Sequence, residues 1–189
     1  LVSRLGMITL VLAMMLVATV AGSTFNTFSG MFVSDPFAVY FKVLVLFASA
    51  LTLAISHNYM ENQGIARFEY TVLIVFATLG MMIMISANNL MSLYLGLEMQ
   101  SLSLYVIATF NRDDERSTEA GLKYFVLGAV ASGMLLYGSS LVYGFSGTTD
   151  FQILGNMFAT EHGPDASIGM IVGIVFILAG LSFKVSAVP

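Results

Sequence analysis

The sequence predicts an all-α polytopic membrane protein of about six transmembrane helices, and three observations lead to this class. Of its 189 residues, 58% are hydrophobic and only 10% are charged, with a mean hydropathy of +0.90. A soluble domain has about a quarter charged residues, so this chain could not cover a water-facing surface. The apolar residues fall in six runs near the roughly 20 residues that a spanning helix requires. The arginines fall only on alternate connections between those runs.

Composition also excludes several kinds of site. The net charge of −4 argues against nucleic-acid binding. The absence of cysteine excludes disulfides, iron–sulfur ligation and a thiol nucleophile. His57 and His162 fall in different connections, and the chain has no glycine-rich nucleotide motif. We therefore expect no metal and no cofactor in this chain, and any redox centre would belong to a partner.

The first three predicted helices span about residues 5–20, 38–56 and 70–86. The second follows Asp35 and Pro36, which are suited to the N-cap and the first turn. Residues 22–33 form a predicted loop whose aromatic side chains suit the lipid interface. Residues 57–69 form a predicted polar connection.

The last three predicted helices span about residues 90–110, 118–144 and 168–188. Asn88 and Asn89 make a tight turn before the first of them, and residues 111–117 form a charged turn in water. The connection 145–167 has an apolar face after Asp150, compatible with a short interfacial helix. Pro189 is expected to break the last helix.

The ends of the chain suggest a fragment. It starts at Leu1 instead of a methionine and stops at Pro189 directly after an apolar run. We expect residues 1–189 to form a single transmembrane domain that belongs to a longer protein.

The basic residues predict a topology. If six helices alternate, one side of the membrane carries four arginines and the connections on the other side carry no lysine or arginine. The positive-inside rule places the arginine side in the cytoplasm. Lys42 lies about one and a half turns inside the second helix, where it is expected to extend to the lipid headgroups. The four arginines are Arg4, Arg67, Arg112 and Arg116.

Glu98 is the first candidate functional residue, because it lies about 18 Å from the end of its predicted helix and so near mid-membrane. Tyr94, Ser101 and Tyr105 share its helix face. Ionisable groups inside a membrane cost several kcal/mol and are usually functional. The alternative is a protonated carboxyl that only anchors helix packing.

Lys123 is the second candidate. It follows Glu119 by four residues, which is an ordinary helix ion pair, and lies about one turn beyond the charged turn. It could be a proton carrier that faces inward, or an interfacial lysine that reaches water.

Lys184 is the third candidate. It shares a helix face with Gly169, Gly173 and Gly180, and small residues let a neighbouring helix approach closely. We therefore expect Lys184 to point into a helix interface. A lysine out of water releases its proton more readily, which suits proton exchange. The glycines alone would indicate only packing.

Two segments carry a resemblance to a known family: LEMQSLSLYVIATFNRDDERSTEAGLKYFVLGAVASGMLLYGSSLVYGFSG and LSFKVSAVP. They resemble the subunit N group of the antiporter-like membrane subunits of NADH–quinone oxidoreductase, respiratory complex I. Subunits L and M and the Mrp-type antiporters share the buried Glu and Lys but are less similar around EAGLKYF. In this resemblance Glu98 matches the family's glutamate, Lys123 the lysine of the next helix and Lys184 the broken-helix lysine.

The resemblance implies part of an inverted-repeat antiporter-like fold, in a multi-pass subunit of the bacterial inner membrane. The family's first helix and second repeat are not in this chain. The implied function is proton translocation coupled to quinone reduction elsewhere in the complex. The implied partners are the antiporter-like M subunit, the small K- and J-type subunits and the lipid bilayer. NADH, flavin, iron–sulfur clusters and quinone are expected in partner subunits.

Two other functions remain open from the sequence. The chain could be part of an Mrp-type cation/proton antiporter. It could also be a structural membrane subunit whose buried charges only fix helix packing.

Overall fold

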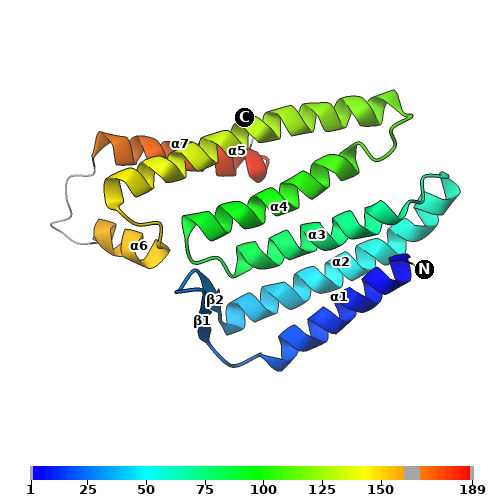
Figure 1. Ribbon diagram of the computed structural model, residues 1–189, viewed down its shortest axis with the longest axis horizontal. Coiled ribbons are helices and arrows are strands. Elements are labelled where there is room, and N and C mark those ends of the chain that lie inside the picture. The colour runs from blue at the N-terminus through cyan, green and yellow to red at the C-terminus, as the bar shows by residue number, and fades with distance from the viewer. Residues whose placement is uncertain (1, 160–166, 188–189) are drawn as a thin grey trace.

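The computed structural model describes residues 2–159 and 167–187, and these form an all-α bundle with one small hairpin (Figure 1). Helices α1 to α5 are each long and apolar enough to cross a membrane, and α7 is a shorter apolar helix. This confirms the predicted polytopic class, with the sixth predicted span observed as the 17-residue α7. The elements are α1 (Val2–Thr19), β1 (Phe25–Thr27), β2 (Phe32–Ser34), α2 (Pro36–Asn62), α3 (Phe68–Ile85), α4 (Leu90–Ala108), α5 (Glu115–Ser146), α6 (Phe151–Ala159) and α7 (Ile168–Lys184).

Two helices extend into sequence that we predicted to be connections. Helix α2 continues to Asn62, past the predicted end at residue 56, and His57 lies 3.4 Å from Glu61 on its last turns. Helix α5 begins at Glu115, because the Asp114 carboxylate accepts a hydrogen bond from the Arg116 backbone N–H. Hydropathy marks the part of a helix that lies in lipid, whereas polar residues continue the backbone hydrogen bonds beyond it.

Helix α7 ends earlier than predicted, at Lys184 instead of residue 188. Ser186 has a left-handed backbone with φ of 56°, which a continuing right-handed helix cannot contain. The predicted break at Pro189 lies outside the described residues. In Figure 1, the C-terminal end of α7 lies beside the middle of α5.

The bundle has two different ends (Figure 1). The arginine end holds the start of α1 and the connections 63–67 and 109–114. The hairpin end holds β1 and β2, the α3–α4 turn and the α5–α6 connection. The hairpin replaces the loop predicted for residues 22–33, and Phe28, Ser29 and Gly30 turn it with positive φ angles.

Asn88 ties the hairpin end together. Its Nδ2 donates to the Gly30 carbonyl at 3.0 Å and to Asp150 Oδ2 at 3.3 Å. The other oxygen of Asp150 accepts from the backbone N–H groups of Gln152 and Ile153, and thereby begins α6. The short helix considered after Asp150 is therefore present as α6.

The interior consists of two apolar clusters. One lies between α1, α2 and α3, around Leu10, Leu46 and Leu53. The other lies between α4, α5, α6 and α7. The two halves join where α3 crosses α4 at Gly80 and Gly96, since a Cβ on Gly80 would lie 2.7 Å from the Gly96 carbonyl oxygen.

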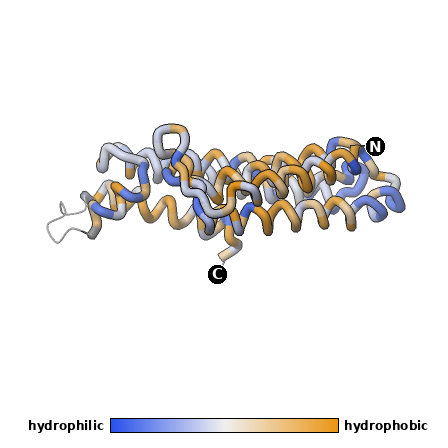
Figure 2. Tube along the Cα trace, turned by 90° about the horizontal axis from the view of Figure 1, so that it is seen from below, coloured by the Kyte–Doolittle hydropathy of each residue, from blue (hydrophilic) through white to orange (hydrophobic). Residues whose placement is uncertain are grey.

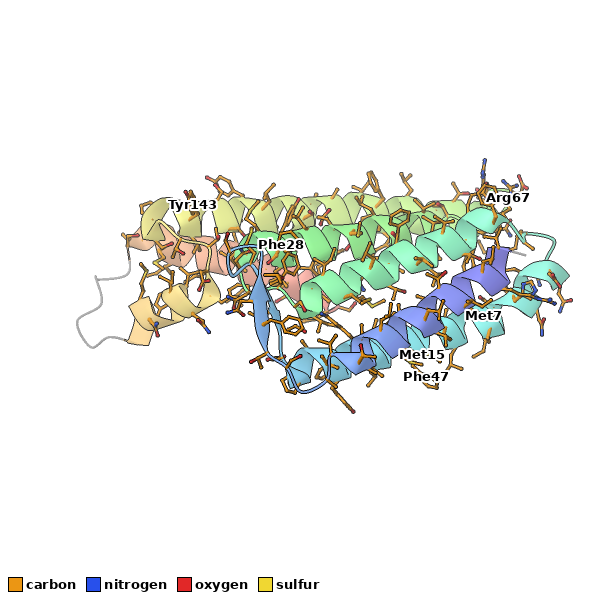
Figure 3. All side chains as sticks on the ribbon, turned by 60° about the horizontal axis from the view of Figure 1, so that its bottom comes forward. Met7, Met15, Phe28, Phe47, Arg67 and Tyr143 are labelled. Atoms are coloured by element: carbon orange, nitrogen blue, oxygen red, sulfur yellow. The ribbon has the colours of Figure 1, made fainter. Side chains whose placement is uncertain are left out.

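The outer faces of the bundle are apolar. Met15 and Phe47 point away from α1 and α2 in Figure 3 and are 58% and 55% exposed. Figure 2 shows long hydrophobic stretches of helix, with hydrophilic residues gathered near the connections. Such faces need lipid or further protein around them.

Candidate functional site

Helix α4 presents the polar face that its sequence predicts. Asn89 begins the helix, with its Oδ1 accepting from the Ser92 backbone N–H at 2.7 Å. From that start, Tyr94, Glu98, Ser101 and Tyr105 share one face by helical spacing. Ser101 and Tyr105 are both buried, at 5% exposure each. The face is therefore turned into protein and not toward lipid.

Helix α7 brings Lys184 onto this face, and all of its recorded partners are on α4. Its Nζ donates to Ser101 Oγ at 2.6 Å and to the Tyr105 hydroxyl at 3.2 Å. The same Nζ lies 3.5 Å from Glu98 Oε1. The side chain of Lys184 is 9% exposed and that of Glu98 is 20% exposed. Two of the three predicted site residues thus form a partly buried ion pair.

Helix α5 supplies a hydroxyl group that the sequence analysis missed. Ser132 Oγ donates to Glu98 Oε1 at 2.5 Å, on the same oxygen that faces Lys184. The Tyr94 hydroxyl lies 3.3 Å from Ser132 Oγ and can donate to it, because the Ser132 proton is already engaged. A helical repeat of small residues on α5 is the signal that could have located Ser132; it includes Gly128, Ser132 and Ser139, all buried.

Close packing between α5 and α7 positions Lys184. A Cβ on Gly138 would lie 2.6 Å from the Gly173 carbonyl oxygen, and a Cβ on Gly180 would lie 2.8 Å from the Ala131 carbonyl oxygen. The predicted glycine face of α7 is therefore confirmed as a helix interface. Gly128 has a related role, since a Cβ there would overlap the Tyr105 hydroxyl.

Lys123 is not part of this cluster. It forms an ion pair with Glu119 on the same helix, and the side chains of the two residues are 69% and 61% exposed. Among residues 2–159 and 167–187, no hydrogen bond or ion pair joins it to Glu98 or Lys184. The Tyr105 ring packs against Tyr124, next to Lys123, at a centroid distance of 4.7 Å.

The cluster combines two ionisable side chains with several hydroxyl groups. It places an ammonium, a carboxylate and four hydroxyl groups in contact inside an apolar bundle. In such surroundings a charge is stable only while its partner is close. No group of three or more His, Asp or Glu in the described part of the chain could hold a metal.

A family model described as NADH:quinone oxidoreductase/Mrp antiporter, transmembrane, matches residues 87–189. The matched region contains Glu98, Lys184 and the four hydroxyl-bearing residues around them. The chain is 59% identical over 190 residues to NADH-quinone oxidoreductase subunit N of Paramagnetospirillum magneticum, covering 100% of this chain and 39% of that protein. It is 59% identical over 162 residues to subunit N of Rhodospirillum rubrum, covering 86% and 33%.

Solved structures agree with these relatives. A chain of respiratory complex I from Thermus thermophilus superposes with a TM-score of 0.78 at 30% identity, covering 97% of this chain and 38% of that one. A chain of an archaeal membrane-bound sulfane sulfur reductase shares the fold, with a TM-score of 0.66 at 23% identity, covering 95% and 37%. The chain thus spans less than half of the length of these relatives.

Proposed function

This chain belongs to the NADH:quinone oxidoreductase/Mrp antiporter transmembrane family, and from that premise we propose that it is part of a proton-translocating membrane-arm subunit of NADH–quinone oxidoreductase. Its relatives are subunit N of that oxidoreductase complex. The observation that supports translocation through this chain is the Glu98–Lys184 pair at 3.5 Å, buried where α7 ends inside the bundle.

The proposed mechanism is a switch of that ion pair. While Glu98 is close, its negative charge favours the ammonium form of Lys184. When α7 moves away from α4, Lys184 loses Glu98 together with Ser101 and Tyr105, and its proton can leave toward a neighbouring group. The Ser132 hydroxyl stabilises the carboxylate while it carries charge.

Lys123 is proposed as a relay on the arginine side of the cluster, which we assign to the cytoplasm. Its exposed position would require a partner subunit or the remainder of the protein to cover it. Quinone reduction elsewhere in the complex would drive the switch. NADH, flavin, iron–sulfur clusters and quinone would be bound by partner subunits, and the M-type and small K- and J-type subunits would lie beside this one in the bacterial inner membrane.

A cation/proton antiporter is the second candidate, because the family description includes the Mrp antiporters. The two functions differ in what drives transport. A respiratory subunit moves protons only while NADH is oxidised, whereas an antiporter responds to a sodium or potassium gradient alone.

The test uses the complete protein in its complex, in inside-out membrane vesicles. Glu98→Gln and Lys184→Ala should depress NADH-driven proton uptake by about tenfold, equivalent to about 1.4 kcal/mol in the barrier. Quinone-linked NADH oxidation should fall with it. NADH oxidation by an artificial acceptor, which bypasses the membrane arm, should remain. Glu61→Gln, at the exposed end of α2, is the matched control and should pump normally.

Lys184→Arg separates a proton carrier from a structural cation. Arginine keeps the charge but does not release its proton, so this variant should pump as poorly as Lys184→Ala. Wild-type pumping by Lys184→Arg would show that Lys184 only fixes helix packing. Proton movement driven by a sodium gradient without NADH would favour the antiporter.

A further inference from the structure

A cavity of about 420 Å³ lies at the hairpin end of the bundle, and neither Glu98 nor Lys184 lines it. Its size falls within the range of small-molecule sites, about 300–1,000 Å³. The end of α1, the hairpin, the first turns of α2 and the last turn of α3 line it. Most of its wall is apolar, including Leu16, Val17, Val20, Phe25, Phe28 and Met82.

Four polar side chains interrupt this apolar wall, those of Thr27, Ser34, Lys42 and Ser86, and the last two carry the argument. Lys42 lines the cavity and is only partly exposed, and no hydrogen bond or ion pair is recorded for it among the described residues. Ser86, at the end of α3, also lines the cavity, and only 6% of its surface is exposed. Its hydroxyl has no hydrogen-bond partner within the described parts of the chain. Buried polar groups are normally paired, so an unpaired hydroxyl in a cavity wall indicates a missing ligand.

The charge distribution indicates what the ligand carries. All seven lysines and arginines lie in the described residues, and Lys42 is the one placed at the hairpin end. The closest carboxylate along the chain, Asp35, already accepts a hydrogen bond from the Ala38 backbone N–H at 2.6 Å. Asp35 attracts the Lys42 ammonium, but no ion pair joins Lys42 to any carboxylate among the described residues. An anion in the cavity would supply the direct contact that this partly buried cation lacks.

We propose that this cavity binds one anionic phospholipid. The phosphate would accept hydrogen bonds from Lys42 and Ser86. An acyl chain would pack against the apolar side chains of α1 and α3 that line the cavity. A headgroup at this depth is reasonable, since Lys42 lies less than two turns from the start of α2 at Pro36. The bound lipid would hold the hairpin, α1 and α3 together at the end of the bundle that lacks other basic residues.

The test uses the complete complex in nanodiscs of phosphatidylcholine. One sample contains a trace of phosphatidylglycerol with a photoactivatable group in its acyl chain, and a second contains the same amount of photoactivatable phosphatidylcholine. After irradiation, mass spectrometry locates the labelled peptides. We expect the anionic probe to label residues 16–39 and 82–86 at least about tenfold more than the neutral probe, as one charge-assisted hydrogen bond would give.

Matched variants assign the effect to the cavity. Lys42→Gln should remove the preference for the anionic probe, and Lys42→Arg should keep it because the charge remains. Ser86→Ala should lower the labelling by a smaller factor. Arg4→Gln, which removes a charge at the arginine end, should change nothing. None of these residues contacts Glu98 or Lys184.

Three results would overturn the proposal. Equal labelling by the two probes would show that no anionic headgroup is selected. Loss of labelling with excess inorganic phosphate would indicate a general anion site without a lipid tail. Attachment of probes outside the cavity, while a polypeptide segment fills it, would show that protein and not lipid is the occupant.

Discussion

Ser132 shows how a single hydroxyl group can adjust a buried ion pair. It donates to the Glu98 oxygen that also faces Lys184, so the carboxylate is held from two sides by α5 and α7. A hydrogen bond to the charged form of an acid stabilises that form. Lys184 in turn donates hydrogen bonds to Ser101 and Tyr105, so it has two partners besides Glu98.

We expect Ser132→Ala to destabilise the charged form of Glu98, since hydrogen bonds to charged groups contribute about 1.5–3 kcal/mol. Proton uptake should slow by less than in Glu98→Gln, because the carboxylate remains. Infrared difference spectroscopy should show a stronger protonated-carboxyl band, assigned to Glu98 by its absence in Glu98→Gln. Ser140→Ala, at an exposed serine of the same helix, is the control. An unchanged band in Ser132→Ala would mean that the hydrogen bond does not affect the proton.

Helix α5 connects the other elements of the site. Its small residues meet α7 at Gly138 and Ala131 and meet Tyr105 of α4 at Gly128. Because the contacts between α5 and α7 involve backbone atoms, these two helices cannot make room by changing side-chain rotamers. Interhelical packing of this kind is the main source of stability between helices in lipid.

A pair of glycines on α5 tests this packing. Gly138→Ala would place a Cβ 2.6 Å from the Gly173 carbonyl oxygen, whereas Gly133→Ala meets nothing within 4 Å. We expect Gly138→Ala to lower the thermal stability of the complete protein, with an overpacking cost of about 1–3 kcal/mol. Gly133→Ala should be neutral or slightly stabilising, because alanine favours helix by about 0.5–1 kcal/mol. Equal melting temperatures for the two variants would contradict the close packing of α5 on α7.

At the scale of the whole molecule, the chain is a bundle with two distinct ends and an apolar outer surface. The connections with arginines lie at one end, and the hairpin and α6 lie at the other (Figure 1). Figure 3 shows Arg67 and Tyr143 at these opposite ends. Such a bundle is suited to a membrane that it crosses in alternating directions.

The orientation can be tested with single cysteines, since the chain has none of its own. Cysteines at Asn62 and Asp113 should react with an impermeant maleimide only from the cytoplasm, and those at Thr24 and Asn156 only from outside. All four positions are exposed, so accessibility to the reagent is not limiting. Labelling of Asp113 and Asn156 from the same side would mean that α5 does not cross the membrane.

The sequence by itself determined the membrane class and the approximate extent of most helices, and it assigned the three candidate residues to their helices, because hydropathy and helical spacing are local properties. It also placed Tyr94, Ser101 and Tyr105 beside Glu98, and the glycines beside Lys184. It predicted neither the hairpin nor the end of α7 at Lys184. Both depend on residues with positive φ, and of these residues only Gly30 is of a type that signals such a conformation; the others are Phe28, Ser29 and Ser186.

Only the tertiary structure decided which of these residues meet. Residues 98, 132 and 184 come from three helices, and their contact depends on how closely glycines let the backbones approach. The same packing joined Lys184 to Glu98 and left Lys123 on an exposed face with Glu119. Helical spacing fixes the face on which a side chain lies, whereas the partner of that face is set by contacts between distant parts of the chain.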